Sequence, residues 1–359
     1  MRIVLFTDSL GAGGAQRQLV GLAKLLKDAG EDVTVLTYHC DEFYAPFLDE
    51  NGIRYVLLND AQRALKRIVK VCRYVRHEKP DVLIAYQEVP SLIACIAKIF
   101  NPEMKLIVSE RNTTQKIDKV LKIRFFLYRW ADAIVPNSYS QENFIRGYCP
   151  RLMDKVKTIT NFVDLSKFSV PQNKRRSAKP VIMVAATIFN SKNTLGLIEA
   201  VNLIPKPDRN FVIKWYGYSE RFGDYYNQCV AKIASYGLEE YIQLLPKTQN
   251  ISECYQEADY FCLPSFFEGT PNVICEAISC GLPVLCSDIC DNAIYVHEDE
   301  NGFLFDPESH ESIAAAIQRI VLLDEKRYME FSKQSRLIAE DRLSENVFLR
   351  KYQEVIERI

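Results

Sequence analysis

Short β-branched runs alternate with amphipathic stretches along nearly the whole chain. The runs are typical of buried strands, and the stretches between them have helical periodicity. The first half predicts strands at 3–7, 33–37, 54–58, 82–86, 106–109 and 133–136, with helices near 15–29 and 61–77. The second half predicts strands at 181–186, 211–216, 242–245, 260–263, 284–286 and 302–305, with helices near 194–202, after 270 and from 309 onward. This rhythm predicts α/β architecture with two Rossmann-like, doubly wound parallel sheets.

A polar segment at 169–179 interrupts the alternation and predicts a linker. We therefore expect an N-terminal domain over 1–170 and a C-terminal domain over 171–342. The final helix, 343–359, has an apolar stripe that we expect to pack back on the N-terminal domain. The length of 359 residues fits two domains. Two such domains would face each other across a cleft at the carboxyl ends of their strands, where ligands of these folds bind.

Composition narrows the class of protein. Hydrophobic residues make up 48% and charged residues 25% of the chain, as in soluble globular proteins. The N-terminus reads as a strand, no apolar run is long enough to span a membrane, and a cytoplasmic location is expected. The eleven cysteines form no C-x-x-C pair and read as buried free thiols, so a zinc site is not expected. The pI of about 6.5 and the lack of a binding motif argue against nucleic acid.

Two carboxylates, Glu268 and Glu276, flank a turn that can start a helix. Thr270 can cap the helix and Pro271 suits its first position. The free N–H groups and the dipole of such a helix start favour an anion such as a diphosphate. Glu276 follows within an apolar stretch, so it needs a partner or a polar cleft. The alternative is an ordinary acid at the exposed end of a buried helix.

Other candidate binding residues lie at turns that follow predicted strands. Lys192, just before a helix of the second domain, suits a phosphate, although such a lysine alone is usually only a surface residue. Gly13 and Gly14 follow the first strand, but the third glycine of a dinucleotide fingerprint is missing. A tight turn that admits a ligand to the backbone is the favoured interpretation. The chain has no D-x-D sequence, so diphosphate charge would fall to side chains and backbone dipoles, with no metal or cofactor.

The chain resembles the family 4 retaining glycosyltransferases, which have the GT-B fold of two Rossmann-like domains facing across a cleft. The resemblance rests on Ala258–Ala277 with its E-x7-E spacing, and on Gly281–Val284. It extends over the chain through Gly13–Gln16, Lys192–Asn193 and Asn301–Leu304.

The resemblance implies roles for the candidate residues. Glu276 would accept hydrogen bonds from the ribose of a nucleotide sugar, Glu268 would touch the donor sugar, and Lys192 would bind the phosphates. Gly13 and Gly14 would close over the donor from the other domain, and the chain would use no covalent nucleophile. The remaining donor-binding residues would be Gly269, Thr270, Pro271, Asn272 and Val273.

The chain departs from the family pattern at two positions. Thr187 stands where many relatives have an arginine, so Lys192 would carry more of the diphosphate charge. Arg111 stands where many have a histidine, and we expect a catalytic role for it near the donor sugar or the acceptor. The alternative for Arg111 is a surface salt bridge with Glu110.

The first 170 residues carry 25 Lys+Arg against 19 Asp+Glu, a net charge of +6, which leaves −7 for the remainder. Basic residues line one side of the predicted helix at 61–77, with Leu65 among the apolar residues of the other side, and they recur with aromatic residues over 116–130. Both segments could meet an anionic membrane surface on its cytoplasmic side, or they could be ordinary solvated helix faces.

We therefore expect a metal-independent retaining hexosyltransferase that uses a nucleotide diphosphate sugar, with UDP as the expected nucleotide. The acceptor would be a glycan or a polyprenyl-diphosphate-linked glycan in surface polysaccharide synthesis. A sugar-nucleotide epimerase of the same fold and a catalytically silent glycan-binding protein remain the alternatives.

Overall fold

A computed structural model describes residues 1–359 except 59–62, 113, 115 and 173. Contacts divide the chain into two compact units. The N-terminal unit comprises Met1–Phe162 with Glu345–Ile359, and the C-terminal unit comprises Val163–Ser344. The division between Phe162 and Val163 comes before the polar segment at 169–179 that the sequence pattern predicts as the linker.

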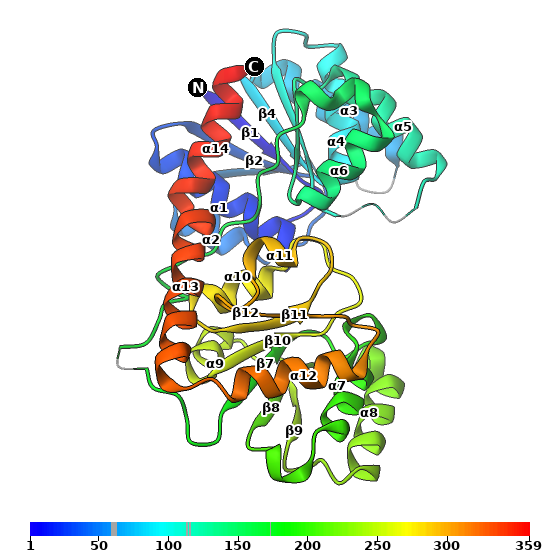
Figure 1. Ribbon diagram of the computed structural model, residues 1–359. Coiled ribbons are helices and arrows are strands. Elements are labelled where there is room, and N and C mark those ends of the chain that lie inside the picture. The colour runs from blue at the N-terminus through cyan, green and yellow to red at the C-terminus, as the bar shows by residue number, and fades with distance from the viewer. Residues whose placement is uncertain (59–62, 113, 115, 173) are drawn as a thin grey trace. The chain divides into compact units, whose positions relative to one another are not determined.

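The N-terminal unit is built on a six-stranded parallel sheet in the order β3-β2-β1-β4-β5-β6 (Figure 1). Its strands are β1 (Arg2–Phe6), β2 (Asp32–Thr37), β3 (Arg54–Leu57), β4 (Val82–Tyr86), β5 (Lys105–Glu110) and β6 (Ala133–Pro136). The four inner strands β1, β2, β4 and β5 and the edge strand β6 bury nearly all of their residues, as strands of doubly wound sheets do, whereas the edge strand β3 is only half-buried.

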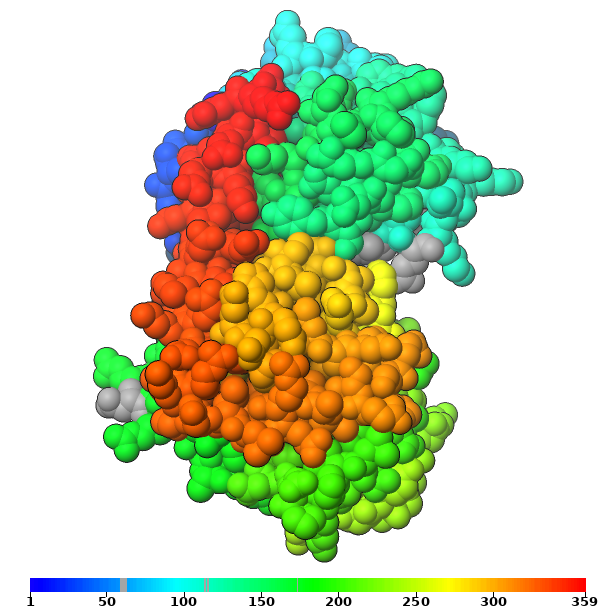
Figure 2. Space-filling view, in the orientation of Figure 1, coloured from blue at the N-terminus to red at the C-terminus, as the bar shows by residue number. Residues whose placement is uncertain are grey.

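Alternate residues of these strands feed two hydrophobic clusters, one on each face of the sheet. One face is covered by α1 (Gly14–Asp28), α2 (Ala45–Glu50) and α14 (Glu345–Arg358). The other is covered by α3 (Ala64–Glu78), α4 (Glu88–Ile99), α5 (Lys119–Leu127) and α6 (Tyr139–Tyr148). Helix α14 buries Phe348, Tyr352, Val355 and Ile356 against the first face, and its outer side is exposed (red in Figure 2).

The C-terminal unit has a second parallel sheet in the order β12-β11-β10-β7-β8-β9 (Figure 1). Its strands are β7 (Val181–Ala185), β8 (Val212–Tyr218), β9 (Ile242–Pro246), β10 (Tyr260–Leu263), β11 (Val284–Ser287) and β12 (Gly302–Phe305). Helices α7 (Thr194–Leu203), α8 (Gly223–Ser235) and α12 (His310–Val321) cover one face. Helices α9 (Ile251–Glu257), α10 (Asn272–Ser279) and α11 (Asn292–Tyr295) cover the other, and α13 (Glu325–Leu343) contributes to both clusters.

The predicted fold class is confirmed, and each predicted strand lies within two residues of an observed one. The predicted start of the helix at Ala61 lies outside the described residues. Each of the eleven cysteines is a free thiol, as expected, but the expectation that they are buried is wrong for Cys40 and Cys290, which are exposed. Among the described residues, no helix combines the length and apolarity that crossing a bilayer requires.

Candidate functional site

Strand order locates a binding edge in the C-terminal unit. After β7 the chain adds β8 and β9 on one side of the sheet and then β10, β11 and β12 on the other side. The strand order therefore reverses between β7 and β10. Ligands of open α/β sheets bind outside the carboxyl ends of the strands at such a switch point. The segments that follow these two strands, 186–193 and 264–271, carry Lys192 and Glu268.

Lys192 and Glu268 form an ion pair at this edge, with 2.6 Å between Lys192 Nζ and Glu268 Oε1. The Ser265 hydroxyl donates to the same carboxylate oxygen at 2.6 Å. The two segments are joined through their backbones, because Phe266 N donates to Ser191 O. Lys192 ends a short 3₁₀ turn, Asn190–Lys192, and its side chain is 26% exposed. The cluster therefore presents a cation and a carboxylate, both fixed in position, to a ligand.

Helix α10 begins one residue later than the sequence suggests. Pro271 occupies the N-cap position, and its carbonyl accepts from Cys275 N at 3.0 Å, so Asn272 is the first helical residue. The prediction of Thr270 as the cap and Pro271 as the first residue was wrong by one position. The φ of −78° that the proline ring imposes suits the position just before the helix as well as the first helical one. The start of α10 still follows Gly269 directly and lies beside Glu268 in sequence.

Glu276 is buried in α10, with 5% of its surface exposed. The hydroxyl of Tyr255, a fully buried residue of α9, donates to Glu276 Oε2 at 3.2 Å. The interpretation of Glu276 as an acid at an exposed helix end is therefore wrong. Nothing in the sequence pointed to Tyr255, which belongs to the preceding helix, α9.

Thr187 follows β7 at the point where the backbone crosses β8. Ile188 N donates to Gly217 O, and a Cβ atom at Gly217 would lie 1.7 Å from Ala186 O. Only glycine fits at 217, since the obstructing atom belongs to the backbone. Thr187 is thus held at the carboxyl edge of the sheet, half-buried, in the same segment as Lys192.

The sheet of the N-terminal unit has its own switch point, between β1 and β4. Gly13 caps α1 and Gly14 is its first residue. A Cβ at Gly13 would lie 2.2 Å from Gln16 Oε1, so glycine here leaves room for the Gln16 amide. That amide donates through Nε2 to Asp8 Oδ1 at 3.1 Å. The glycine turn therefore packs against a polar side-chain network.

Arg111 is buried rather than exposed, and it does not pair with Glu110. Its guanidinium donates to Asn161 Oδ1 and to Ser109 Oγ, the latter at 3.2 Å, and lies over the Tyr86 ring at 4.7 Å. Glu110 is the last residue of β5 and Arg111 follows it, and their side chains contact different partners. The alternative of a surface salt bridge between them is therefore wrong.

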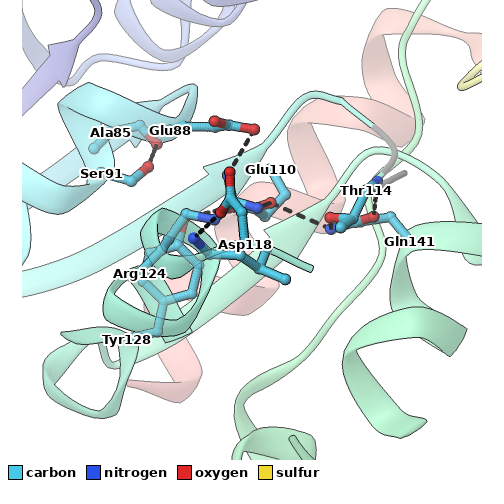
Figure 3. Close-up of polar contacts among 10 residues, drawn as sticks. Ala85, Glu88, Ser91, Glu110, Thr114, Asp118, Arg124, Tyr128 and Gln141 are labelled. Atoms are coloured by element: carbon cyan, nitrogen blue, oxygen red, sulfur yellow. Dashed lines mark hydrogen bonds and ion pairs between the residues drawn. The ribbon is translucent and has the colours of Figure 1, made fainter. Parts of the chain in front are cut away.

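Glu110 belongs instead to a buried cluster under α5, which Figure 3 shows. Its carboxylate lies 3.5 Å from Arg124 Nη2 and accepts from Gln141 Nε2 at 3.2 Å and from the Tyr128 hydroxyl. Burial raises the pKa of the Glu110 carboxyl, and the positive charge of Arg124 partly offsets this rise. Arg124 also contacts Glu88 Oε1 at 2.6 Å through Nη1. The cluster ties α4, α5 and α6 to the end of β5, beside Arg111.

The structure thus brings Lys192 and Glu268 into direct contact, with Thr187 and Gly269–Val273 in the same two segments and Glu276 one turn into α10. Gly13, Gly14 and Arg111 belong to the N-terminal unit. Sequence reasoning missed Ser265, although it stands within the quoted signature, and it missed Tyr255.

The chain matches two family descriptions that adjoin each other. Residues 12–167 match "Glycosyltransferase Family 4", and residues 166–338 match "Glycosyl transferases group 1". Together the two matches extend over most of both units.

Several curated relatives align over nearly their full length. The amylovoran biosynthesis glycosyltransferase AmsD of Erwinia amylovora is 21% identical, over 90% of this chain and 91% of its own. A 4-alpha-N-acetylgalactosaminyltransferase of Campylobacter jejuni, which acts on a diphospho-undecaprenol-linked saccharide by its name, is 26% identical over 91% and 92%.

Solved structures share the fold over the whole chain. A glycosyltransferase from Rickettsia africae superimposes with a TM-score of 0.86 at 19% identity, over 99% of this chain and 98% of its own. Anabaena HepE, solved in complex with UDP and glucose, superimposes with a TM-score of 0.84 at 19% identity, over all of both chains. The structure has two doubly wound sheets, with an E-x7-E segment at one switch point, and the family matches extend over both units. The chain therefore belongs to the family 4 glycosyltransferases of the GT-B fold.

Proposed function

We propose that the protein is a metal-independent retaining hexosyltransferase that transfers a sugar from a UDP-linked donor to a glycan hydroxyl. The observation that carries the proposal is the contact of Lys192 with Glu268 at the β7–β10 switch point, just ahead of the start of α10. A cation for the diphosphate and a carboxylate for a sugar hydroxyl lie side by side there. Glu276, further along the same helix, serves the ribose.

The proposed reaction exchanges one bond at the anomeric carbon for another on the same face of the sugar. The bond from C1 to the diphosphate oxygen breaks, a bond from C1 to the acceptor oxygen forms, and the acceptor proton passes to the leaving diphosphate. Within the C-terminal unit, Glu268 is the only carboxylate assigned to the sugar, whereas double displacement needs a close pair of carboxyl groups. Its role is to bind and orient the donor sugar.

Lys192 and the backbone N–H groups at the start of α10 would stabilise the charge that develops on the diphosphate. Such fixed donors are effective because they need no reorganisation during the reaction. With no D-x-D sequence in the chain, this arrangement supports catalysis without a metal or another cofactor. Arg111, fixed over Tyr86 in the N-terminal unit, is proposed to contact the donor sugar or the acceptor.

The names of the relatives support the choice of substrates. HepE was solved with UDP-glucose, and an Escherichia coli relative, 25% identical over 87% of this chain, is a galactosyltransferase named for UDP-Gal and a diphosphoundecaprenol-linked acceptor. We therefore propose a UDP-hexose donor and a polyprenyl-diphosphate-linked glycan acceptor in surface polysaccharide synthesis.

The test is a panel of UDP- and GDP-linked sugars, incubated with and without a membrane extract and followed by mass analysis. We expect a glycan product that gains one hexose only when extract is present, with a rate that excess EDTA does not change. An isomerised nucleotide sugar in the absence of extract would identify an epimerase. Failure of every nucleotide diphosphate to raise the thermal midpoint would favour a silent glycan-binding protein.

We also propose that the N-terminal unit binds anionic membrane through α5 and the residues just before it. Four large apolar side chains of this segment are 53% to 58% exposed, namely Ile117, Val120, Ile123 and Phe126. Exposed cations lie among them: Lys116, Lys119, Lys122 and Arg129.

Helix α3 is the weaker candidate for a membrane-binding segment. It exposes Leu65 to 78%, contrary to the helical projection, because its buried side chains are Val71 and Val75 in later turns.

Replacing Lys119 and Lys122 by alanine should weaken binding to phosphatidylglycerol vesicles about 20- to 30-fold. The estimate follows from about 1 kcal/mol for each cation near the membrane surface. Sedimentation of the protein with these vesicles measures the effect, with Lys326→Ala in the C-terminal unit as the control. Equal sedimentation of the double variant and the wild-type protein would contradict the proposal, as would equal binding to neutral phosphatidylcholine.

A further inference from the structure

Gln87 has a backbone conformation that is nearly restricted to glycine. It follows β4 with φ 75° and ψ 171° and leads directly into α4. Side chains clash with the backbone in this region, and non-glycine residues found there cluster at functional sites. Its conformation is held from both sides, since Gln87 N donates to Ser109 O at 3.0 Å and Gln87 O accepts from Ser91 N at 3.1 Å. Glycine could adopt the same backbone conformation without strain, so the presence of a glutamine side chain needs a separate explanation.

The side chain of Gln87 meets a polar network at the β1–β4 switch point. Thr7, the residue after β1, has its hydroxyl oxygen 3.3 Å from both Gln87 Oε1 and Asp8 Oδ1, so these two acceptors share its single proton. Asp8 Oδ1 also accepts from Ser9 N at 2.7 Å and from Gln16 Nε2 at 3.1 Å. The network joins the end of β4 to the Gly13 turn.

Two polar groups of this network stay unused. Over the part of the chain that the structure describes, no hydrogen bond engages Asp8 Oδ2 or Gln87 Nε2. One is a carboxylate acceptor and the other an amide donor, and both side chains are only half-buried. Both side chains contact the Thr7 hydroxyl, and an acceptor and a donor on two such neighbouring side chains match the two capacities of sugar hydroxyls, each of which can donate and accept.

We propose that Gln87 and Asp8 bind adjacent hydroxyls of a pyranose sugar, and that the strained backbone at Gln87 is maintained to aim its amide at that sugar. The inference rests on the proposed function, and it adds a saccharide subsite in the N-terminal unit. The hydroxyls belong either to the hexose of the donor or to the acceptor glycan.

The test compares Gln87→Gly with Gln87→Ala. Both variants lack the amide, so both should lose roughly 3- to 10-fold in kcat/KM, as expected for one hydrogen bond. Only the glycine variant relieves the strain, so its melting temperature should be about 2 °C or more above that of the alanine variant. At most positions alanine gives the more stable protein, so this order would be reversed. Asp8→Asn should lose activity to a similar extent. Loss confined to glycan transfer would assign the hydroxyls to the acceptor, whereas loss shared with hydrolysis of the donor in water would assign them to the donor.

Lys79 provides a matched control, because it also has a positive φ, 47°, in the N-terminal unit but lies at the C-terminus of α3. Lys79→Gly should melt above Lys79→Ala with both activities unchanged. Wild-type activity in both Gln87 variants, or an alanine variant at least as stable as the glycine variant, would overturn the inference alone. A wild-type protein that neither transfers sugar nor hydrolyses a nucleotide sugar would instead overturn the proposed function and this inference with it.

Discussion

Glu268→Gln should lower the turnover number by about 10²- to 10³-fold while the affinity for UDP stays nearly unchanged. Glutamine keeps the size of the side chain and a carbonyl oxygen that can still accept from Lys192, but it removes the charge that accepts from the donor sugar. Loss of one fixed electrostatic group in an active site costs about 2.7 to 4 kcal/mol of transition-state stabilisation. The UDP product lacks the sugar, so its binding should not depend on this carboxylate. Steady-state kinetics and titration of UDP by calorimetry measure the two quantities.

The variant should fold, because Lys192 is 26% exposed and water can solvate it once its partner is gone. Glu240→Gln, at an exposed position of the same unit, is the matched control and should leave turnover unchanged. A Glu268→Gln enzyme with wild-type turnover would remove Glu268 from the proposed mechanism. Equal losses in turnover and in UDP affinity would instead indicate that the whole loop is displaced.

The strands could be predicted because each is a short run rich in β-branched, aromatic or other apolar residues, and most of these runs are largely buried. Strands 82–86, 133–136, 260–263 and 302–305 coincide with the observed ones. Helices were harder to predict where the alternation of apolar and polar residues is weak. Helix α4 is so apolar that it reads as a mere hydrophobic run, and α5 has buried and exposed apolar residues on several sides.

The candidate site was predictable where chemistry and spacing coincide in one segment. The E-x7-E segment and Lys192 were proposed as site residues in that way, and the strand order at the switch point explains why Lys192 and Glu268 are in contact. Contacts between separate elements could not be predicted from the sequence pattern. Examples are the hydrogen bonds of Tyr255 with Glu276 and of Arg111 with Asn161. The strained backbone of Gln87 was equally invisible, since the conformation follows from the packing of β4, β5 and α4 rather than from a local turn signal.

The two units repeat one arrangement. In each, the first strand and the fourth strand are neighbours, and polar side chains gather on the segments that follow them. In the C-terminal unit these are Lys192 and Glu268, and in the N-terminal unit Asp8 and Gln87. Helices cover both faces of each parallel sheet, so each unit offers a ligand edge at the strand ends of its own switch point. The C-terminal edge, which holds the cation, suits a diphosphate, and the N-terminal edge suits neutral hydroxyls.

Glu276→Gln should weaken UDP binding by about 10- to 150-fold and leave turnover at saturating donor close to that of the wild-type protein. The carboxylate is proposed to accept charge-assisted hydrogen bonds from the ribose, each contributing about 1.5 to 3 kcal/mol. These bonds are the same in the bound donor and in the transition state, so their loss raises KM rather than lowering kcat. Calorimetric titration of UDP measures the affinity, and initial rates over a range of donor concentrations give kcat and KM.

A ligand-side control separates the ribose contact from a general disturbance of α10. UDP that lacks both ribose hydroxyls cannot donate to Glu276, so it should bind the wild-type protein and Glu276→Gln equally well. Tyr255→Phe should show the same dependence with a smaller effect, because the Tyr255 hydroxyl holds Glu276 Oε2 without replacing its charge. If the dideoxy ligand loses as much affinity as UDP in Glu276→Gln, the carboxylate acts through the packing of the buried helix and not through the ribose. Since Glu276 is 5% exposed, thermal melting of each variant accompanies these titrations and reports that packing directly.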